Sequence, residues 1–180
     1  MGNERWILGT IQKLPDRDGR AITEIGAGDG NLSCTLARRF PQAVVSACDL
    51  APAPQRMPSN LHWQQGNIFE APEEIRGNTL IANLFLHHFE AAELRQIGKI
   101  TDRFDSFIFC EPDRARLPHF HGSLLHPFIN RVTRHDMHVS IDAGFTAGEI
   151  PRFLGLDTGR WEIREQSNWR GSRRVVGWRV

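Results

Sequence analysis

The 180-residue chain lacks the features that mark several classes of protein. No apolar run approaches the ~18–20 residues of a membrane-spanning helix, and residues 1–20 lack the uninterrupted apolar region of a secretory leader. Cysteine is scarce, and Cys34, Cys48 and Cys110 are odd in number and widely spaced, which indicates reduced core thiols. The net charge is only +1, so no strong field favours nucleic acid or a membrane surface. We therefore expect a cytoplasmic globular protein with no membrane association.

What the chain does contain is an alternation of short apolar runs with helical patterns. A helix capped by Asn31 is expected to run to Pro41, another covers residues 90–104, and Thr146 with Glu149 forms a capping-box pattern before a short helix. Such alternation predicts a doubly wound, Rossmann-like α/β fold with a mostly parallel seven-stranded sheet that ends in an antiparallel hairpin. The expected strands are Ala21–Ile25, Val44–Cys48, Leu61–Gln64, Thr79–Phe85, Ser106–Cys110, Trp161–Gln166 and Arg173–Val180.

The domain organisation follows from the lengths of these elements and of the segments between them. Residues 1–180 are predicted to form a single domain, because no repeat or low-complexity linker divides them. Residues 1–20 would be a short N-terminal cap. Residues 112–147 are long for a connection between a strand and a helix, and such insertions tend to be functional. We expect this insertion to cover an acceptor pocket.

The stretch "ITEIGAGDGNLS" carries three alternating glycines, Gly26, Gly28 and Gly30, between the first strand and the first helix of the alternation. In a doubly wound sheet, a glycine-rich first turn lets a ligand approach the backbone beyond the strand ends. An acid about 20 residues on suits a ribose diol, and Asp49 stands at that distance. The spacing differs from the G-x-G-x-x-G of dinucleotide-binding proteins. Glu24, two residues before the first glycine, would disfavour a pyrophosphate and favour a ligand that carries positive charge.

At these residues the sequence resembles the class I S-adenosylmethionine-dependent methyltransferases. "EIGAGDG" is similar to their first motif, and Asp49 matches the acid that holds the ribose hydroxyls. Asn67 in "GNIF" stands where the family usually has an acid facing the adenine amine. "ANLFLHHF" is similar to the fourth-strand motif of small-molecule methylases, notably the ubiquinone/menaquinone biosynthesis group, and places Asn83 near the methionine end of the cofactor. The resemblance implies S-adenosylmethionine as cofactor, with this set of cofactor-binding residues: Glu24, Gly26, Gly28, Gly30, Asp49, Leu50, Asn67, Ile68 and Asn83.

Histidines are the candidate catalytic groups. Methyl transfer from a sulfonium is an in-line displacement that depends mainly on placement, and a base is needed only if the acceptor arrives protonated. "RHDMHVSI" brings His135 and Asp136 together in sequence, so a histidine oriented by a carboxylate is feasible. We predict His135, Asp136 and His88 as catalytic residues. His87 and His138 remain alternatives as the base.

Other side chains leave two interpretations open. Glu111, at the end of the fifth strand, could contact the substrate or cap a turn. Phe85, Phe89, Phe120 and Phe128 could line an apolar acceptor pocket or belong to the core. His119 and His121 could hold a metal together with His135 or Asp136, but methyl transfer does not require one and none is predicted.

The acceptor expected from the resemblance is a small molecule, aromatic, phenolic or quinol-like. An RNA methyltransferase is the first alternative, because residues 160–180 interleave arginines with Trp161, Trp169 and Trp178, although a solvated or dimer-forming surface would give the same pattern. With two lysines, Lys13 and Lys99, the chain cannot readily supply the catalytic lysines of ribose methylases. A cofactor-binding scaffold without activity is the second alternative. A nicotinamide-dependent oxidoreductase is disfavoured by the glycine spacing.

Overall fold

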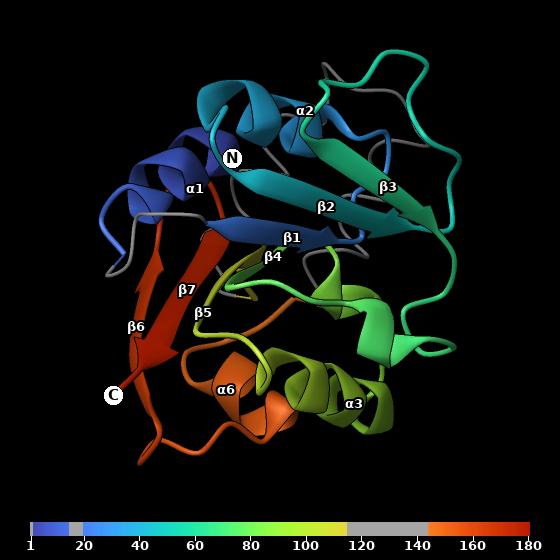
Figure 1. The fold of residues 1–180 in the computed structure, drawn as a ribbon. Coiled ribbons are helices and arrows are strands. Elements are labelled where there is room, and N and C mark those ends of the chain that lie inside the picture. The colour runs from blue at the N-terminus through green and yellow to red at the C-terminus, as the bar shows by residue number, and fades with distance from the viewer. Residues whose placement is uncertain (1, 15–19, 115–143) are drawn as a thin grey trace, which may run out of the picture.

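The computed structural model describes residues 2–14, 20–114 and 144–180. They form a seven-stranded sheet in the order β3-β2-β1-β4-β5-β7-β6, with helices on both faces (Figure 1). The first five strands in this order are parallel, and the last two form the antiparallel hairpin. The predicted fold class is confirmed. The strands are β1 Ala21–Ile25, β2 Val44–Asp49, β3 Leu61–Gln65, β4 Thr79–Asn83, β5 Ser106–Pro112, β6 Trp161–Ser167 and β7 Ser172–Arg179.

Helices cover both faces of the sheet, which explains why its central strands consist mainly of apolar residues. The helices α1 (Asn3–Ile11) and α2 (Asn31–Arg39) pack on one face of the sheet, and α3 (Ala91–Thr101) and α6 (Glu149–Leu154) pack on the other (Figure 1). A short 3-10 turn, η1 (Pro72–Glu74), lies between β3 and β4, and another, η2 (Leu86–His88), lies between β4 and α3. Because both faces are covered, all seven residues of β5 are buried, which is the pattern of a central parallel strand. None of the helices in the described ranges is long and apolar enough to span a membrane.

Several element boundaries differ from the sequence-based expectation. The strand β4 ends at Asn83 rather than at Phe85, because Leu84 adopts a left-handed φ of 58° and breaks the extended backbone. The N-cap of α2 is Gly30 rather than Asn31, and the Asn31 N–H donates a hydrogen bond to the Asp29 Oδ1 at 3.1 Å. The N-cap of α6 is Gly148, although Glu149 still accepts the backbone N–H of Thr146, as half of the expected box requires.

The order of the strands reverses at one point in the parallel part of the sheet, between β1 and β4. From β1 the chain proceeds outward to β2 and β3, and β4 then returns to the other side of β1 before β5. The loops after β1 and β4 therefore diverge, and the crevice between such loops is where ligands bind in open α/β sheets. The glycine loop and the "LFLHHF" segment follow these two strands.

All three cysteines are buried free thiols. Burial raises the pKa of Cys48 to about 11, and burial also raises the pKa of Cys110. A thiol that stays protonated is a poor nucleophile, so these side chains belong to the core.

Candidate functional site

The loop between β1 and α2 has the backbone that its glycines predict. Gly26, Gly28 and Gly30 have φ values of 68°, 58° and 75°. Side chains with a Cβ avoid this left-handed region, so the sequence of glycines fixes the turn. The loop is anchored to β2, because the Gly26 N–H donates to the Cys48 carbonyl oxygen at 2.9 Å.

The three glycines nevertheless have different surroundings. A Cβ at Gly26 would lie 2.1 Å from the Phe85 ring, and a Cβ at Gly30 would lie 2.5 Å from Pro54. A Cβ at Gly28 would meet no atom of the described residues within 4 Å. Gly28 is therefore the position where a ligand can approach the backbone, whereas the other two glycines permit close packing of neighbouring loops.

Asp49 joins the end of β2 to this glycine loop. Its Oδ2 accepts the Gly28 N–H at 2.7 Å, and its Oδ1 accepts the Ala51 N–H at 2.8 Å. Leu50, the next residue, is 72% exposed, which leaves its apolar side chain available to a flat ligand. Each carboxylate oxygen has further lone pairs, so Asp49 can hold the loop and still accept hydroxyl groups. Sequence reasoning missed this structural role of Asp49, which only the pairing of β1 with β2 brings about.

Glu24 lies in the core beneath the glycine loop, 2% exposed. Its Oε2 accepts the hydroxyl of Ser33 on α2. The pKa of Glu24 is raised to about 8, mainly because burial disfavours its charge; the hydrogen bonds of Ser33 oppose this rise, and the charges of Asp29 and Asp49 contribute to it. At neutral pH this carboxyl is mainly protonated, so the negative charge expected at the mouth of the site is largely absent. Glu24 links β1 to α2, and direct contact with the cofactor stays a prediction.

Asn67 and Ile68 follow β3 at the same end of the sheet. The Asn67 side chain is exposed, and its Oδ1 accepts the Phe69 N–H at 3.0 Å. The oxygen that was expected to meet the adenine amine therefore already closes a local turn, although it retains a second lone pair. Ile68 is 5% exposed and packs into the core cluster with Leu86.

Asn83, at the end of β4, is held by the N-terminal helix. The Asn3 Nδ2 donates to the Asn83 Oδ1 at 3.0 Å, and the Asn3 Oδ1 accepts the Ser172 hydroxyl at 2.7 Å. Asn3 is 6% exposed, so this relay is buried. With its oxygen directed at Asn3, the Asn83 side chain presents its NH₂ elsewhere. Sequence reasoning missed Asn3, because its partners are 80 and 169 residues away.

Glu111 organises the loop that follows β4. Its side chain is fully buried, and its Oε1 accepts the N–H groups of Phe85 at 3.0 Å and Leu86 at 2.8 Å. Its Oε2 lies 2.7 Å from the His87 Nδ1. Of the two interpretations left open by the sequence, the described contacts support the one in which Glu111 fixes a turn. It also pairs with a histidine, which the sequence did not indicate.

The two adjacent histidines have different environments. The side chain of His87 is 5% exposed and paired with Glu111, whereas His88 is exposed, with its ring centroid 4.1 Å from that of His87. Partial burial lowers the pKa of His88, the neighbouring His87 lowers it further, and Glu111 opposes both. His87 is therefore the described histidine that a carboxylate orients. The predicted catalytic residues His135 and Asp136 lie outside the described residues.

Aromatic side chains form one wall next to this loop. The rings of Phe85 and Phe89 are 4.8 Å apart and edge-on, and those of Phe69 and Phe89 are 5.4 Å apart in the same geometry. All three are partly buried and pack against the core cluster that includes Leu86. These contacts support the core interpretation of Phe85 and Phe89, and their role in an acceptor pocket stays a prediction. Phe120 and Phe128 lie outside the described residues.

The two ends of the expected insertion meet at the end of β5. Asp113 forms a parallel bridge with Phe145, and the Arg114 guanidinium pairs with the Glu149 carboxylate at 2.7 Å. These described contacts lie at the carboxyl ends of the parallel strands, the end of the sheet that also holds the glycine loop. The two histidines proposed for a metal, His119 and His121, are not described. Within the described ranges, no three His, Cys, Asp or Glu side chains gather as a metal would require.

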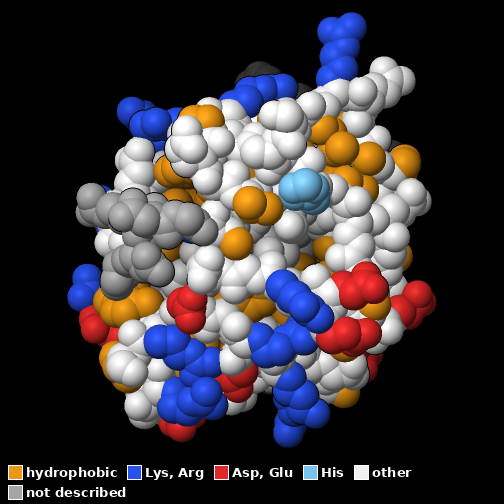
Figure 2. All heavy atoms as spheres, in the orientation of Figure 1, with side chains coloured by type: hydrophobic (Ala, Val, Ile, Leu, Met, Phe, Trp, Pro, Cys, Tyr) orange, Lys and Arg blue, Asp and Glu red, His pale blue; other side chains and the backbone are white. Residues whose placement is uncertain are grey.

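The C-terminal arginines contact aromatic rings of the chain itself. The guanidinium carbons lie 4.3–5.4 Å from ring centroids in the pairs Arg164–Trp178, Arg170–Trp169, Arg174–Trp6 and Arg179–Trp161. On the face shown in Figure 2, basic side chains lie among acidic ones over the half of the molecule that holds α3 and α6. These intramolecular cation–π contacts account for the Arg/Trp pattern without a nucleic acid.

Comparisons with known proteins give short sequence matches to methyltransferases. No family model matches the chain. "Methyltransferase str3" of Strobilurus tenacellus is 44% identical over 52 residues, which are 28% of this chain and 19% of that protein. "Trans-aconitate 2-methyltransferase" of Deinococcus radiodurans is 39% identical over 62 residues, 32% of this chain and 24% of that protein. The matched segments thus span less than a quarter of either relative.

Solved structures extend the likeness to almost the whole chain. The plantazolicin methyltransferase BpumL, in complex with SAH, superposes with a TM-score of 0.80 at 10% identity, covering 98% of this chain and 82% of that one. The pyocyanin biosynthetic protein PhzM superposes with a TM-score of 0.62 at 18% identity, covering 96% and 54%. At such identities the likeness concerns the fold. This chain therefore shares the fold of these two solved structures, one of which is a methyltransferase in complex with SAH.

Proposed function

We propose that this protein transfers a methyl group from S-adenosylmethionine to a small-molecule acceptor that is aromatic, phenolic or quinol-like. One observation carries the proposal. The Gly28 backbone is open to approach and lies beside the Asp49 carboxylate, at the crevice where the loops after β1 and β4 diverge. An open glycine backbone next to an acid that ends the second strand suits a nucleoside whose ribose hydroxyls reach that acid. The short matches to two methyltransferases support the same chemistry.

The residues present fit this cofactor. Asp49 would hold the ribose, Leu50 would contact the adenine, and the NH₂ of Asn83 would meet the polar methionine end. When bound, the cofactor supplies an electrophilic methyl on a sulfonium. The contribution of the chain is placement, because alignment of the nucleophile with the methyl supplies most of the rate enhancement in such a displacement.

Of the two alternative bases named from the sequence, His87 is supported by its contact with Glu111, and it joins His135 and His88 as a candidate. With its Nδ1–H donated to Glu111, the neutral ring leaves Nε2 as the nitrogen that can take a proton. A carboxylate partner stabilises the imidazolium that results. A phenol with a pKa near ~10 requires such a base before oxygen attacks the methyl. The aromatic wall of Phe69, Phe85 and Phe89 would suit a ring-shaped acceptor.

Calorimetric titration with S-adenosylmethionine and with S-adenosylhomocysteine tests the cofactor assignment. We expect micromolar binding of both, and a loss of about tenfold or more in Asp49→Ala, since a charge-assisted hydrogen bond contributes about 1.5–3 kcal/mol. Absence of binding for either compound would refute the proposal. Cofactor binding without turnover of any phenol, quinol or other acceptor would favour the inactive scaffold instead.

An acceptor screen would then separate the candidate bases. With an accepted phenol, His87→Ala, His88→Ala and His135→Ala should be compared at saturating cofactor. The base is the residue whose loss lowers kcat by about a hundredfold or more while cofactor affinity is unchanged. An unchanged kcat in all three variants would exclude these three histidines as the base and leave His138→Ala as the variant to measure next.

A further inference from the structure

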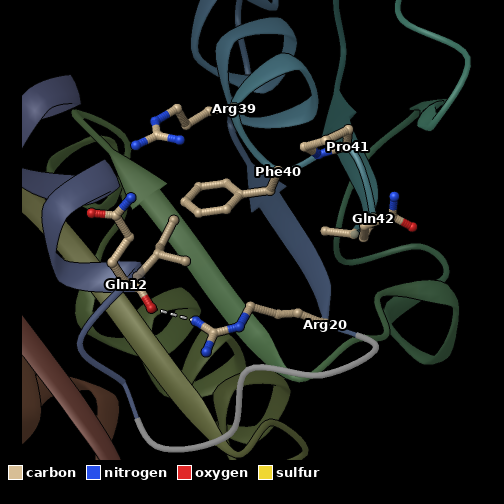
Figure 3. Close-up of a pocket in the computed structure, with 8 residues that line it drawn as sticks. Gln12, Arg20, Arg39, Phe40, Pro41 and Gln42 are labelled. Carbon is tan, nitrogen blue, oxygen red and sulfur yellow. Dashed lines mark hydrogen bonds between the residues drawn. The ribbon is translucent and has the colours of Figure 1, made fainter.

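A pocket lies at the amino ends of the parallel strands, the end of the sheet opposite to the crevice. It has a volume of about 460 Å³, within the range of ~300–1,000 Å³ typical of small-molecule sites. The ends of α1 and α2 and the turn before β2 enclose it, just ahead of the first residues of β1 and β2 (Figure 3). Because the parallel strands begin at this end of the sheet and the glycine loop follows the other end of β1, the pocket is remote from the glycine loop. We call it the α1–α2 pocket; its lining residues in the described chain include Ile11, Gln12, Arg20, Arg39, Phe40 and Gln42.

The α1–α2 pocket combines an aromatic surface with positive charge. The ring of Phe40 lies between the guanidinium groups of Arg39 and Arg20 in Figure 3. Arg20 is 8% exposed, and its Nη1 donates to the Ile11 carbonyl oxygen at 2.6 Å, which fixes this charge in the wall. Arg39 is exposed, so its side chain can adjust to a ligand. Among the described residues that line the pocket there is no aspartate or glutamate.

We propose that the α1–α2 pocket binds a small planar carboxylate. Its ring would pack on Phe40, with Ile11 beneath, and its carboxylate would accept hydrogen bonds from Arg39. The planar guanidinium of Arg39 matches a carboxylate in a two-point geometry, so this exposed side chain is the recognising group of the proposal. The amide of Gln42 at the rim can satisfy a further polar group of the ligand. This site is independent of methyl transfer.

Arg39 also has a structural role that a test must separate from binding. It stands in the last turn of α2, where a positive charge stabilises the helix dipole. Arg38 stands in the same turn and is exposed, but it does not line the pocket. Arg38→Gln is therefore a matched control, because it removes the same charge from the same helix end.

The test uses 2-naphthoate as probe and its uncharged isostere 2-naphthamide as comparison. Binding to the full chain is measured by calorimetry or by ligand-observed NMR, with and without saturating S-adenosylhomocysteine. We expect naphthoate to bind in the millimolar range or better, and naphthamide at least about tenfold more weakly. Arg39→Gln should weaken naphthoate about tenfold, and Arg38→Gln should leave its affinity unchanged.

Three outcomes would overturn the proposal. The first is no binding of naphthoate at millimolar concentration, and the second is equal binding of naphthoate and naphthamide. The third is equal affinity for naphthoate in Arg38→Gln and Arg39→Gln, which would mean that the probe binds elsewhere, for example in the acceptor site. Phe40→Leu provides a second variant if Arg39→Gln is unstable. This variant keeps an apolar side chain but removes the ring. It should weaken the binding of naphthoate severalfold, whereas the control variant Arg38→Gln should still bind naphthoate as the wild type does.

Discussion

The substitution Glu24→Gln tests how the buried carboxyl acts on the glycine loop. Glutamine has nearly the same shape and keeps an oxygen that can accept the Ser33 hydroxyl, but it cannot ionise. Burial raises the pKa of Glu24 from its ordinary value of 4.5 to about 8. The folded protein therefore retains this proton over a pH range in which the unfolded chain has lost it.

The sign and size of the effect follow from that difference. Below the unfolded pKa both states are protonated, and the stabilising contribution of the buried neutral carboxyl is complete. As pH rises from 4.5 to about 8, the unfolded state ionises first, so the free energy of unfolding falls by ~1.4 kcal/mol per pH unit. The total loss is of the order of 4–5 kcal/mol, a large part of the ~5–15 kcal/mol that stabilises a typical domain.

Urea unfolding between pH 5 and pH 9 measures this contribution. The wild type should lose stability steeply as pH rises, Glu24→Gln should lack that part of the slope, and the variant should be the more stable protein at pH 9 by a few kcal/mol. Glu70→Gln removes an exposed carboxyl and should follow the wild type. Parallel profiles for the wild type and Glu24→Gln would refute the reasoning, because they would mean that Glu24 is ionised in the folded state.

Further substitutions test the contacts of the crevice. Asp49→Ala should weaken cofactor binding and also lower the free energy of unfolding by about 1–3 kcal/mol, because the Gly28 and Ala51 N–H groups lose their acceptor. Urea unfolding measures this loss, and unchanged stability would contradict it. In Asn3→Asp the new carboxylate can only accept, so the Asn83 amide should turn its NH₂ toward residue 3 and its oxygen toward the ligand. The affinity for S-adenosylhomocysteine, measured by calorimetry, should then change about tenfold, and equal affinity would remove Asn83 from the site. Glu111→Gln should lower kcat on an identified phenol about tenfold or more with little change in cofactor affinity, and a drop in affinity alone would assign it a purely structural role.

Local patterns in the sequence were enough to predict the fold class and the glycine turn. Apolar runs of strand length between helical patterns predicted a mostly parallel seven-stranded sheet that ends in an antiparallel hairpin, and the glycine loop follows the first of these strands as expected. The left-handed backbone of Gly26, Gly28 and Gly30 was also readable, since it depends on the absence of a side chain at each position. These features depend on a residue and its near neighbours.

Contacts between distant residues could not be read in the same way. Asn3 meets Asn83 because α1 packs beside β4 and β7, and Glu111 meets His87 because β4 and β5 are adjacent strands that end at one level. Burial had the same character: Glu24 was expected to present a charge, but α2 covers it and desolvation keeps it largely neutral. The sequence by itself determined which elements form and where their ends converge. Only the tertiary structure decided which polar groups pair and which are charged, because both depend on the neighbours that packing supplies.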